Sequence, residues 1–214
     1  MITQQAHLNW RGTDLELLPQ RALWQADAGL LLVADLHLGK AESFQASGIP
    51  LPSDGDLSNL NALLELAAQL RPQRVVVLGD LIHSRFGLTA ELRDKIRALP
   101  ELLGCALDLI GGNHDQGSWL EGLQASPPHR CGPLWLSHEP CTPADSALLN
   151  VAGHVHPVAV LGHGADRLRL PCFALHQGQR QLLLPAFGRL TGGYAISADH
   201  QRWVIADKTV LALP

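Results

Sequence analysis

The stretch Leu30-Leu31-Leu32-Val33-Ala34, which runs directly into Asp35-Leu36-His37, decides the fold. Short apolar runs of this kind, rich in Val, Ile and Leu and bounded by Gly, are typical of buried strands. The pattern of an apolar run followed by polar residues recurs four times. The further runs are Val75–Leu78 before Gly79-Asp80, Ala106–Ile110 before Gly111-Gly112-Asn113-His114-Asp115, Leu134–Leu136 before Ser137-His138, and Leu148–Val151 before Gly153-His154-Val155-His156.

Segments with helical spacing lie between the first three of these predicted strands. Leucines fall at steps of three and four residues between 57 and 64, and Arg71-Pro72 ends this run. A second, shorter helix is expected over 89–99, with Thr89 as its N-cap and Pro100 as its stop. Strands that alternate with helices predict an α/β layered fold with a partly parallel sheet. In such sheets ligands bind beyond the carboxyl ends of the strands, where all five polar clusters would lie.

The sequence pattern changes after Gly162. Four apolar stretches, at 167–170, 181–184, 202–205 and 209–212, are separated by turns rich in Gly and Pro. They predict antiparallel strands, and we expect a second sheet that packs on the first. Residues 188–193 are expected to form a loop.

Length and composition limit the classes of protein. The chain has 214 residues, 46% hydrophobic and 17% charged, so we expect one globular domain over residues 1–214. The net charge of −4 argues against a strongly basic binder of nucleic acid. No apolar run approaches the ~20 residues of a membrane span, and no secretory signal opens the chain, so we expect a cytoplasmic protein without a membrane partner. The four cysteines form no Cys-x-x-Cys pair and are expected to be free thiols.

The polar clusters at the strand ends carry the chemistry. Taken singly, each cluster is weak evidence for a functional site, because Asp-x-His pairs arise by chance and a lone histidine is more often structural. Taken together they offer only carboxylate, amide and imidazole groups, with no thiolate among them. This set suits Mn, Fe or Zn and argues against copper(I) or an iron–sulfur cluster.

The five clusters, in this order, resemble the motifs of the calcineurin-like metallophosphoesterases. Those motifs are Asp35-Leu36-His37, Gly79-Asp80-Leu81-Ile82-His83, Gly112-Asn113-His114-Asp115, His138 and Gly153-His154-Val155-His156. Within the family the chain is most similar to the bacterial ligase-associated enzymes, which are DNA-damage-response endonucleases. That likeness rests on Asp35-Leu36-His37-Leu38-Gly39-Lys40-Ala41, on His83 in place of the usual acid, and on Pro171-Cys172-Phe173 and Leu184-Pro185-Ala186-Phe187-Gly188.

The resemblance implies a four-layer α-β-β-α sandwich, in which two mixed sheets are flanked by helices, and a site for two divalent metal ions. It assigns Asp80 as the bridging ligand, His114 as the acid for the leaving group, and Asp115 as the residue that orients His114. The remaining ligands are Asp35, His37 and His156 for one metal, and Asn113, His138 and His154 for the other. The implied function is a two-metal phosphodiesterase or endonuclease that acts on nucleic acid in DNA repair, with Mn²⁺ as the expected activator, Fe or Zn also compatible, and DNA-repair proteins as partners.

Several alternatives stay open. His83 could contact substrate phosphate, support a ligand, or be a plain structural histidine. Lys40, Arg85 and Arg189 could meet phosphate oxygens, although solvated or salt-bridged roles are commoner, and Glu139 could steer His138. Alternative functions are a phosphomonoesterase or a nucleotide or lipid pyrophosphatase of the same superfamily, and, from another class, a catalytically silent scaffold. The sequence does not indicate the oligomeric state.

Overall fold

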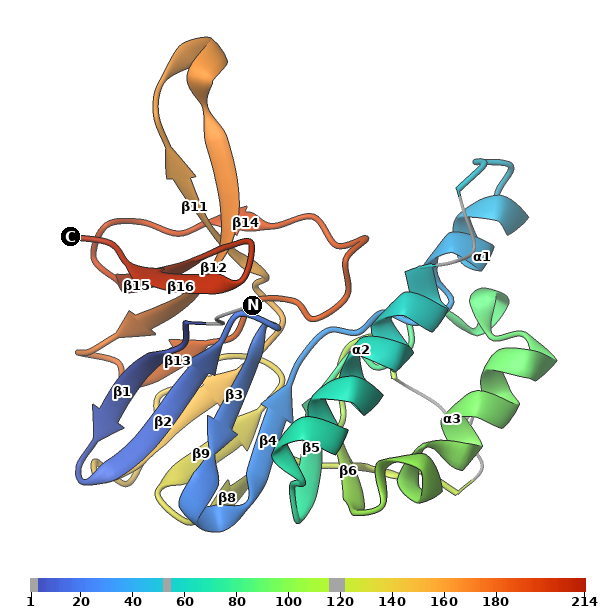
Figure 1. Ribbon diagram of the computed structural model, residues 1–214, viewed down its shortest axis with the longest axis horizontal. Helices are drawn as coiled ribbons and strands as arrows, with labels where there is room; N and C mark the ends of the chain where they lie inside the picture. The colour runs from blue at the N-terminus through green and yellow to red at the C-terminus, as the bar shows by residue number, and fades with distance from the viewer. Residues whose placement is uncertain (1–3, 52–54, 116–121) are drawn as a thin grey trace.

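The computed structural model describes residues 4–51, 55–115 and 122–214, and it contains two mixed β-sheets (Figure 1). The first sheet has seven strands in sequential order: β1 (Ala6–Trp10), β2 (Thr13–Leu18), β3 (Ala22–Gln25), β4 (Leu30–Val33), β5 (Arg74–Leu78), β6 (Ala106–Ile110) and β7 (Ala125–Ser126). Strands β1 to β4 are antiparallel hairpin neighbours, whereas β4 to β7 are parallel. The expected strands at 30–34, 75–78 and 106–110 are therefore present, and the sheet extends through three N-terminal strands that the apolar runs did not predict.

The second sheet has nine strands and contains the expected antiparallel C-terminal part. Its main path is β14 (Tyr194–Ala195), β11 (Pro157–Leu161), β12 (Leu168–His176), β13 (Gln181–Leu183), β10 (Leu149–Ala152), β9 (Leu134–Ser137) and β8 (His129–Cys131). Strands β15 (Gln201–Ala206) and β16 (Thr209–Ala212) branch from β12. The β11–β12 hairpin stands out from the body of the molecule (Figure 1).

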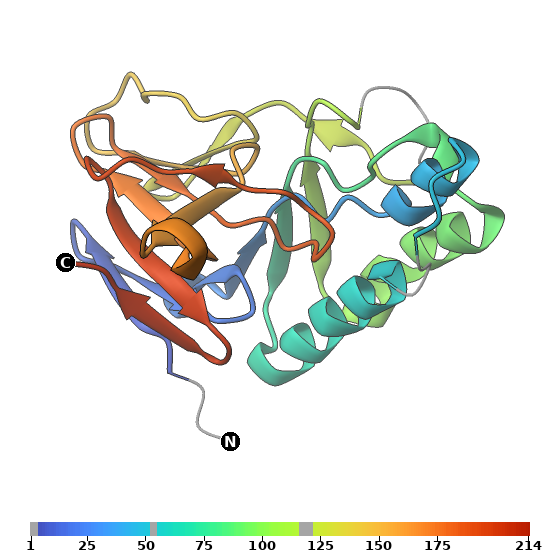
Figure 2. The same ribbon diagram turned by 90° about the horizontal axis from the view of Figure 1, so that it is seen from above.

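The α-helices all belong to the first half of the described chain. They are α1 (Lys40–Ala46), α2 (Gly55–Leu70) and α3 (Ala90–Leu103); α2 and α3 pack on one side of the first sheet, and α1 lies beyond α2 on that same side (Figures 1 and 2). The two-sheet sandwich agrees with the expected fold class, but in the described residues the second sheet has no α-helix on its outer side. Val155 and Ile196, from irregular segments, pack there on buried side chains of β10, β12 and β13. None of the described helices is long and apolar enough to cross a membrane.

The helix caps show how far local signals reach. The Thr89 side chain accepts a hydrogen bond from Leu92 N and begins α3, as expected. The expectation that Pro100 ends α3 is wrong, because the helix continues to Leu103 and ends at Gly104 in the left-handed conformation. Proline removes one backbone donor in this last turn, but Leu99 and Leu103 still pack on the core between helix and sheet.

Two apolar layers hold the fold together, and the alternation of β4 shows how they form. Leu30 and Leu32 face the second sheet, whereas Leu31 and Val33 face the helices. The core between the sheets also contains Phe173 and Trp203 from the second sheet. Because both faces of β4, β5 and β6 are covered, their carboxyl ends are fixed against both layers, and the polar residues that follow them share one edge of the sandwich.

Candidate metal centre

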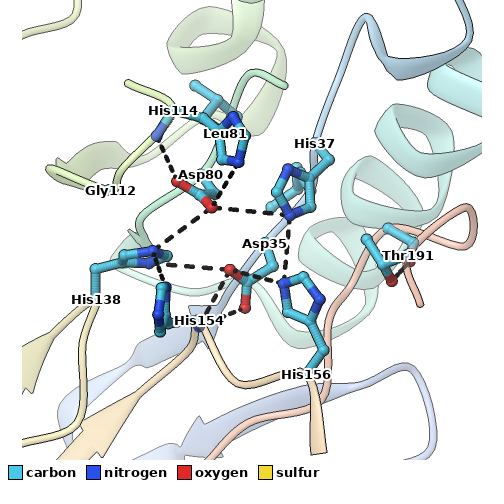
Figure 3. Close-up of polar contacts among 12 residues, drawn as sticks. Asp35, His37, Asp80, Leu81, Gly112, His114, His138, His154, His156 and Thr191 are labelled. Carbon is cyan, nitrogen blue, oxygen red and sulfur yellow. Dashed lines mark hydrogen bonds and ion pairs between the residues drawn. The ribbon is translucent and has the colours of Figure 1, made fainter. Parts of the chain in front are cut away.

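The strand ends of both sheets bring the predicted Asp and His ligands together at one edge of the sandwich (Figure 3). Asp35 and His37 follow β4, Asp80 follows β5, and His114 follows β6. His138 follows β9 in the second sheet, and His154 and His156 follow β10. Three groups of carboxylate and imidazole atoms lie within 4.8 Å of one another: Asp35, His37 and His156; Asp35, Asp80 and His138; and His37, His83 and His114.

The first group contains the three residues expected for one metal ion. His156 Nε2 lies 3.3 Å from Asp35 Oδ1 and 3.3 Å from His37 Nε2. Asp35 is fully buried and His37 is 5% exposed, so these side chains cannot turn away to solvent. The structure therefore brings Asp35, His37 and His156 together as the resemblance implied.

Asp80 lies between this group and the histidines from the second sheet. Its Oδ2 is 3.8 Å from His37 Nε2 on one side and 3.5 Å from His138 Nε2 on the other. His138 Nε2 is in turn 3.2 Å from His154 Nδ1. Asp80 is thus the carboxylate that faces both imidazole sets, which is the position a bridging ligand needs.

Backbone carbonyls fix the orientation of two of these imidazoles. His138 Nδ1 donates to Leu78 O at 2.9 Å, and His156 Nδ1 donates to Gly192 O at 3.1 Å. In their neutral forms, both rings then present the unprotonated Nε2 to the centre. Neutral rings held in this way offer nitrogen lone pairs beside the Asp35 and Asp80 carboxylates, and this donor set fits a divalent cation.

The surroundings shift the pKa values of His37 and His156 in opposite directions. Burial lowers the pKa of His37 to about 2, and the positive charges of His156, Lys40, His114 and His83 act in the same direction. His37 is therefore a neutral imidazole, the form that binds metal ions. Burial opposes protonation of His156, but the Asp35 hydrogen bond and charge, with smaller contributions from Gly192 and Asp80, outweigh it and raise the pKa of His156.

The residues after β6 lie beside Asp80. His114 N donates to Asp80 Oδ1 at 2.9 Å, and His114 Nε2 is 3.9 Å from Asp80 Oδ2. The His114 side chain is 41% exposed, so it lies at the rim, where a bound substrate could reach it. Asn113 is exposed between Gly112 and His114, and none of the hydrogen bonds found among the described residues involves its side chain amide.

Asp115 and Glu139 have other roles than those expected of them. Asp115 was expected to orient the imidazole of His114, but its carboxylate accepts instead from the backbone amides of Ile82, Gly112 and Leu81, at 3.2, 3.2 and 3.4 Å. The turn after Gly112 directs this side chain toward the backbone that follows Asp80, so Asp115 ties the two loops together. Glu139 does not steer His138, since Leu78 O accepts the Nδ1 proton of that ring.

The structure adds His83 to the centre. Its ring stacks on that of His114, with centroids 5.0 Å apart, and meets the ring of His37 edge-on at 5.4 Å. Burial, together with the positive charges of Lys40 and His114, lowers the pKa of His83 to about 4, and Asp80 opposes this shift. The motif Gly79-Asp80-x-x-His83 was the available signal, but spacing alone did not show that His83 would turn toward the centre.

The backbone at the centre is unusual. Of the ten non-glycine residues with positive φ in the described chain, five are predicted ligands: Asp35, His37, Asp80, His154 and His156. Residues other than glycine rarely adopt positive φ, although Asp and His tolerate it better than most. Residues with such strained backbone cluster at functional sites. Gly79 contributes in a related way, because a Cβ at this position would overlap the His138 ring.

Comparisons with known proteins agree with this geometry. The calcineurin-like phosphoesterase family model matches residues 29–204. A nuclease of Pseudomonas putida, MPE, has a crystal structure that is similar with a TM-score of 0.79 and 30% identity, covering 98% of this chain and 100% of that chain. Yfce, a phosphoesterase from E. coli, gives a TM-score of 0.49 at 18% identity and covers 86% of this chain and 96% of that chain. No curated protein matches the chain. The first structure agrees with the expected likeness to the ligase-associated endonucleases of the PdeM type.

Proposed function

The chain belongs to the calcineurin-like phosphoesterase family and is a metal-dependent phosphoesterase, and from that premise we propose that it is a two-metal phosphodiesterase that cleaves nucleic acid. The observation that carries the proposal is the position of Asp80, whose Oδ2 faces His37 from the first sheet and His138 from the second. Asp35, His37 and His156 would hold one ion, and Asn113, His138 and His154 the other, with Asp80 shared between them. Bound there, two divalent cations would activate water and neutralise charge on the phosphoryl oxygens.

The chain's own groups then do three things. Leu78 O and Gly192 O hold His138 and His156 with their Nε2 atoms toward the centre. Asp80 Oδ1 accepts from His114 N, which fixes the start of the rim loop. The His114 imidazole lies at that rim and is placed to donate a proton to the departing oxygen of the ester.

The nucleic-acid substrate is supported by the nuclease of Pseudomonas putida, which matches this chain over nearly its whole length. We place the activity in DNA repair on the likeness to ligase-associated endonucleases, which implies contact with DNA-repair proteins and a cytoplasmic location. We propose Mn²⁺ as the activator on the family resemblance, and the imidazole, carboxylate and amide ligands are compatible with it as well as with Fe²⁺ and Zn²⁺.

The test compares ester classes across metals. Purified protein is loaded in turn with Mn²⁺, Fe²⁺, Zn²⁺ and Mg²⁺, and turnover is measured on bis-p-nitrophenyl phosphate, p-nitrophenyl phosphate and a single-stranded oligonucleotide. We expect the diester to be cleaved faster than the monoester, with the oligonucleotide cut internally. Equal or faster cleavage of the monoester at saturating metal would assign the site to a phosphomonoesterase, and protein that no metal activates would favour a silent scaffold.

A further inference from the structure

A cavity of about 270 Å³ borders the metal centre at His156, on the side of the loop over residues 188–193. Three arginines line it: Arg21 from the turn before β3, Arg169 from β12 and Arg189 from the loop. No aspartate or glutamate is among its described lining residues. The chain as a whole carries a net charge of −4, so this local excess of positive charge runs against the overall balance.

The two arginines with hydrogen bonds in the cavity are held by backbone carbonyls. Arg21 donates to Ala186 O at 3.2 Å and to Gly188 O at 3.5 Å, and Arg169 donates to Gly193 O at 2.7 Å. A carbonyl positions a guanidinium group without neutralising its charge, and each group keeps other N–H donors. Within the described chain, none of the three arginines forms a salt bridge.

Arg189 and Arg21 lie close enough to repel each other. Burial, together with the positive charge of Arg189, lowers the pKa of Arg21. Arg189 is exposed and also borders a neighbouring cavity that Glu65 lines, yet the two residues form no ion pair. Like charges grouped without a counter-ion fit an anion, and the planar guanidinium matches the oxygens of a phosphate.

Since His156 belongs to both the cavity and the metal centre, an anion in the cavity would lie next to the reacting phosphate. Along one strand of nucleic acid a phosphate recurs at every nucleotide, about 3.4 Å apart along a duplex axis. A strand whose scissile phosphate occupies the metal centre must therefore place its next phosphates on adjoining surfaces.

We propose that Arg21, Arg169 and Arg189 form a subsite for a phosphate that neighbours the scissile one in a nucleic-acid strand. This inference rests on the proposed function, because it takes the metal centre as the place of cleavage. It makes the enzyme selective for substrates with more than one phosphate, and it does so through residues that touch neither metal ion nor reacting atoms.

The kinetic test uses the Mn²⁺-loaded enzyme and three substrates: the dinucleotide TpT, which has one phosphate, and its phosphorylated forms pTpT and TpTp. We expect kcat/KM for one phosphorylated form to exceed that for TpT by about tenfold, the effect of one hydrogen-bonded charge. Arg189→Ala should remove this advantage and leave TpT unchanged, and Arg189→Lys should restore part of it. Arg74→Ala is the matched control, because Arg74 is exposed at the start of β5, the end of that strand opposite the metal centre, and pairs there with Asp108.

A binding measurement separates the subsite from the reaction. Calorimetry compares thymidine 5′-phosphate with thymidine 3′,5′-bisphosphate, neither of which contains a diester. Tighter binding of the bisphosphate that Arg189→Ala abolishes supports the subsite even if no dinucleotide is cleaved, a result that would count against the proposed function alone. Three results would overturn the subsite: no gain from a second phosphate in the wild type in either measurement, a gain that Arg189→Ala keeps, or an equal loss in Arg74→Ala.

Discussion

Gly79→Ala tests whether the approach of His138 to the first sheet holds the metal centre together. The φ of Gly79 is 79°, and a Cβ there would overlap three atoms of His138, among them Nδ1. His138 is 2% exposed and donates from Nδ1 to Leu78 O, so the ring cannot move away from the new Cβ without breaking this hydrogen bond. We expect the alanine variant to lose both stability and metal affinity.

The expected magnitude combines three costs to stability with one to metal affinity. A side chain in the left-handed region costs about 1–2 kcal/mol. Overpacking adds about 1–3 kcal/mol, and loss of the hydrogen bond to Leu78 O about 1 kcal/mol. Loss of a partner that orients a metal ligand lowers metal affinity or activity about 10–100-fold. Gly104→Ala isolates the first cost, because Gly104 has a φ of 65° and nothing within 4 Å of an added Cβ.

The assay is urea unfolding of both variants, together with Mn²⁺ titration and turnover on bis-p-nitrophenyl phosphate. We expect Gly79→Ala to be about 2–4 kcal/mol less stable than Gly104→Ala and to need at least tenfold more Mn²⁺, because only the first variant displaces His138. Equal losses of stability in the two variants, with normal Mn²⁺ affinity for Gly79→Ala, would refute the reasoning.

Three further predictions concern single side chains. Asp80→Asn should lose most activity and weaken both metal ions, and metal analysis that finds two tightly bound ions with near-normal turnover would exclude the bridging role. His114→Ala should keep its metals and lose about 10²–10⁴-fold in rate, with a smaller loss for a nitrophenyl diester than for a nucleotide ester; an equal loss on both would exclude the general acid. Burial raises the pKa of Asp56 to about 6, against the hydrogen bond from Gly39 N that lowers it, and Glu42 adds to the rise. Its pKa is then higher in the folded than in the unfolded chain, so its contribution to stability is complete below about pH 4 and is lost as the pH rises through 6; Asp56→Asn should remove this part of the slope in urea unfolding.

The sequence predicts those parts of the fold in which burial leaves a clear apolar pattern. The runs before Asp35 and Asp80 predict β4 and β5, because strands covered on both faces are apolar throughout. Helix α1 leaves no such pattern, since Ala41 is its only buried residue among those described, and β11 begins at Pro157, which reads as a turn. Polar residues interrupt the apolar runs of the first two N-terminal strands, namely His7 and Asn9 in β1 and Asp14 and Glu16 in β2, and β3 is only four residues long.

At the centre, the sequence predicts which strand ends meet but not which way each side chain points. Asp35 and Asp80 converge because the parallel strands β4 and β5 end at the same edge of the first sheet, and His138 and His154 follow the parallel strands β9 and β10 of the second sheet. Asp115 and His83 depend instead on tight turns whose direction is set by neighbouring loops. Asp115 turns to the amides after Asp80, and His83 turns inward to stack on His114. Neither orientation follows from a spacing of one or three residues.

The left-handed backbone of five predicted ligands lowers the stability of the fold in order to place those side chains at the metal centre. Each such residue costs about 1 kcal/mol or more. Five of them therefore lower the free energy of unfolding by several kcal/mol, in a chain whose net stability is of the order of 5–15 kcal/mol. Glycine would relieve this strain. His154 has a φ of 66° and is exposed, so its replacement leaves no buried cavity. His154→Gly should therefore raise the melting temperature while it removes a metal ligand. Selection for thermal stability alone would therefore erode the metal centre first, and a library screened for heat resistance must also be screened for turnover.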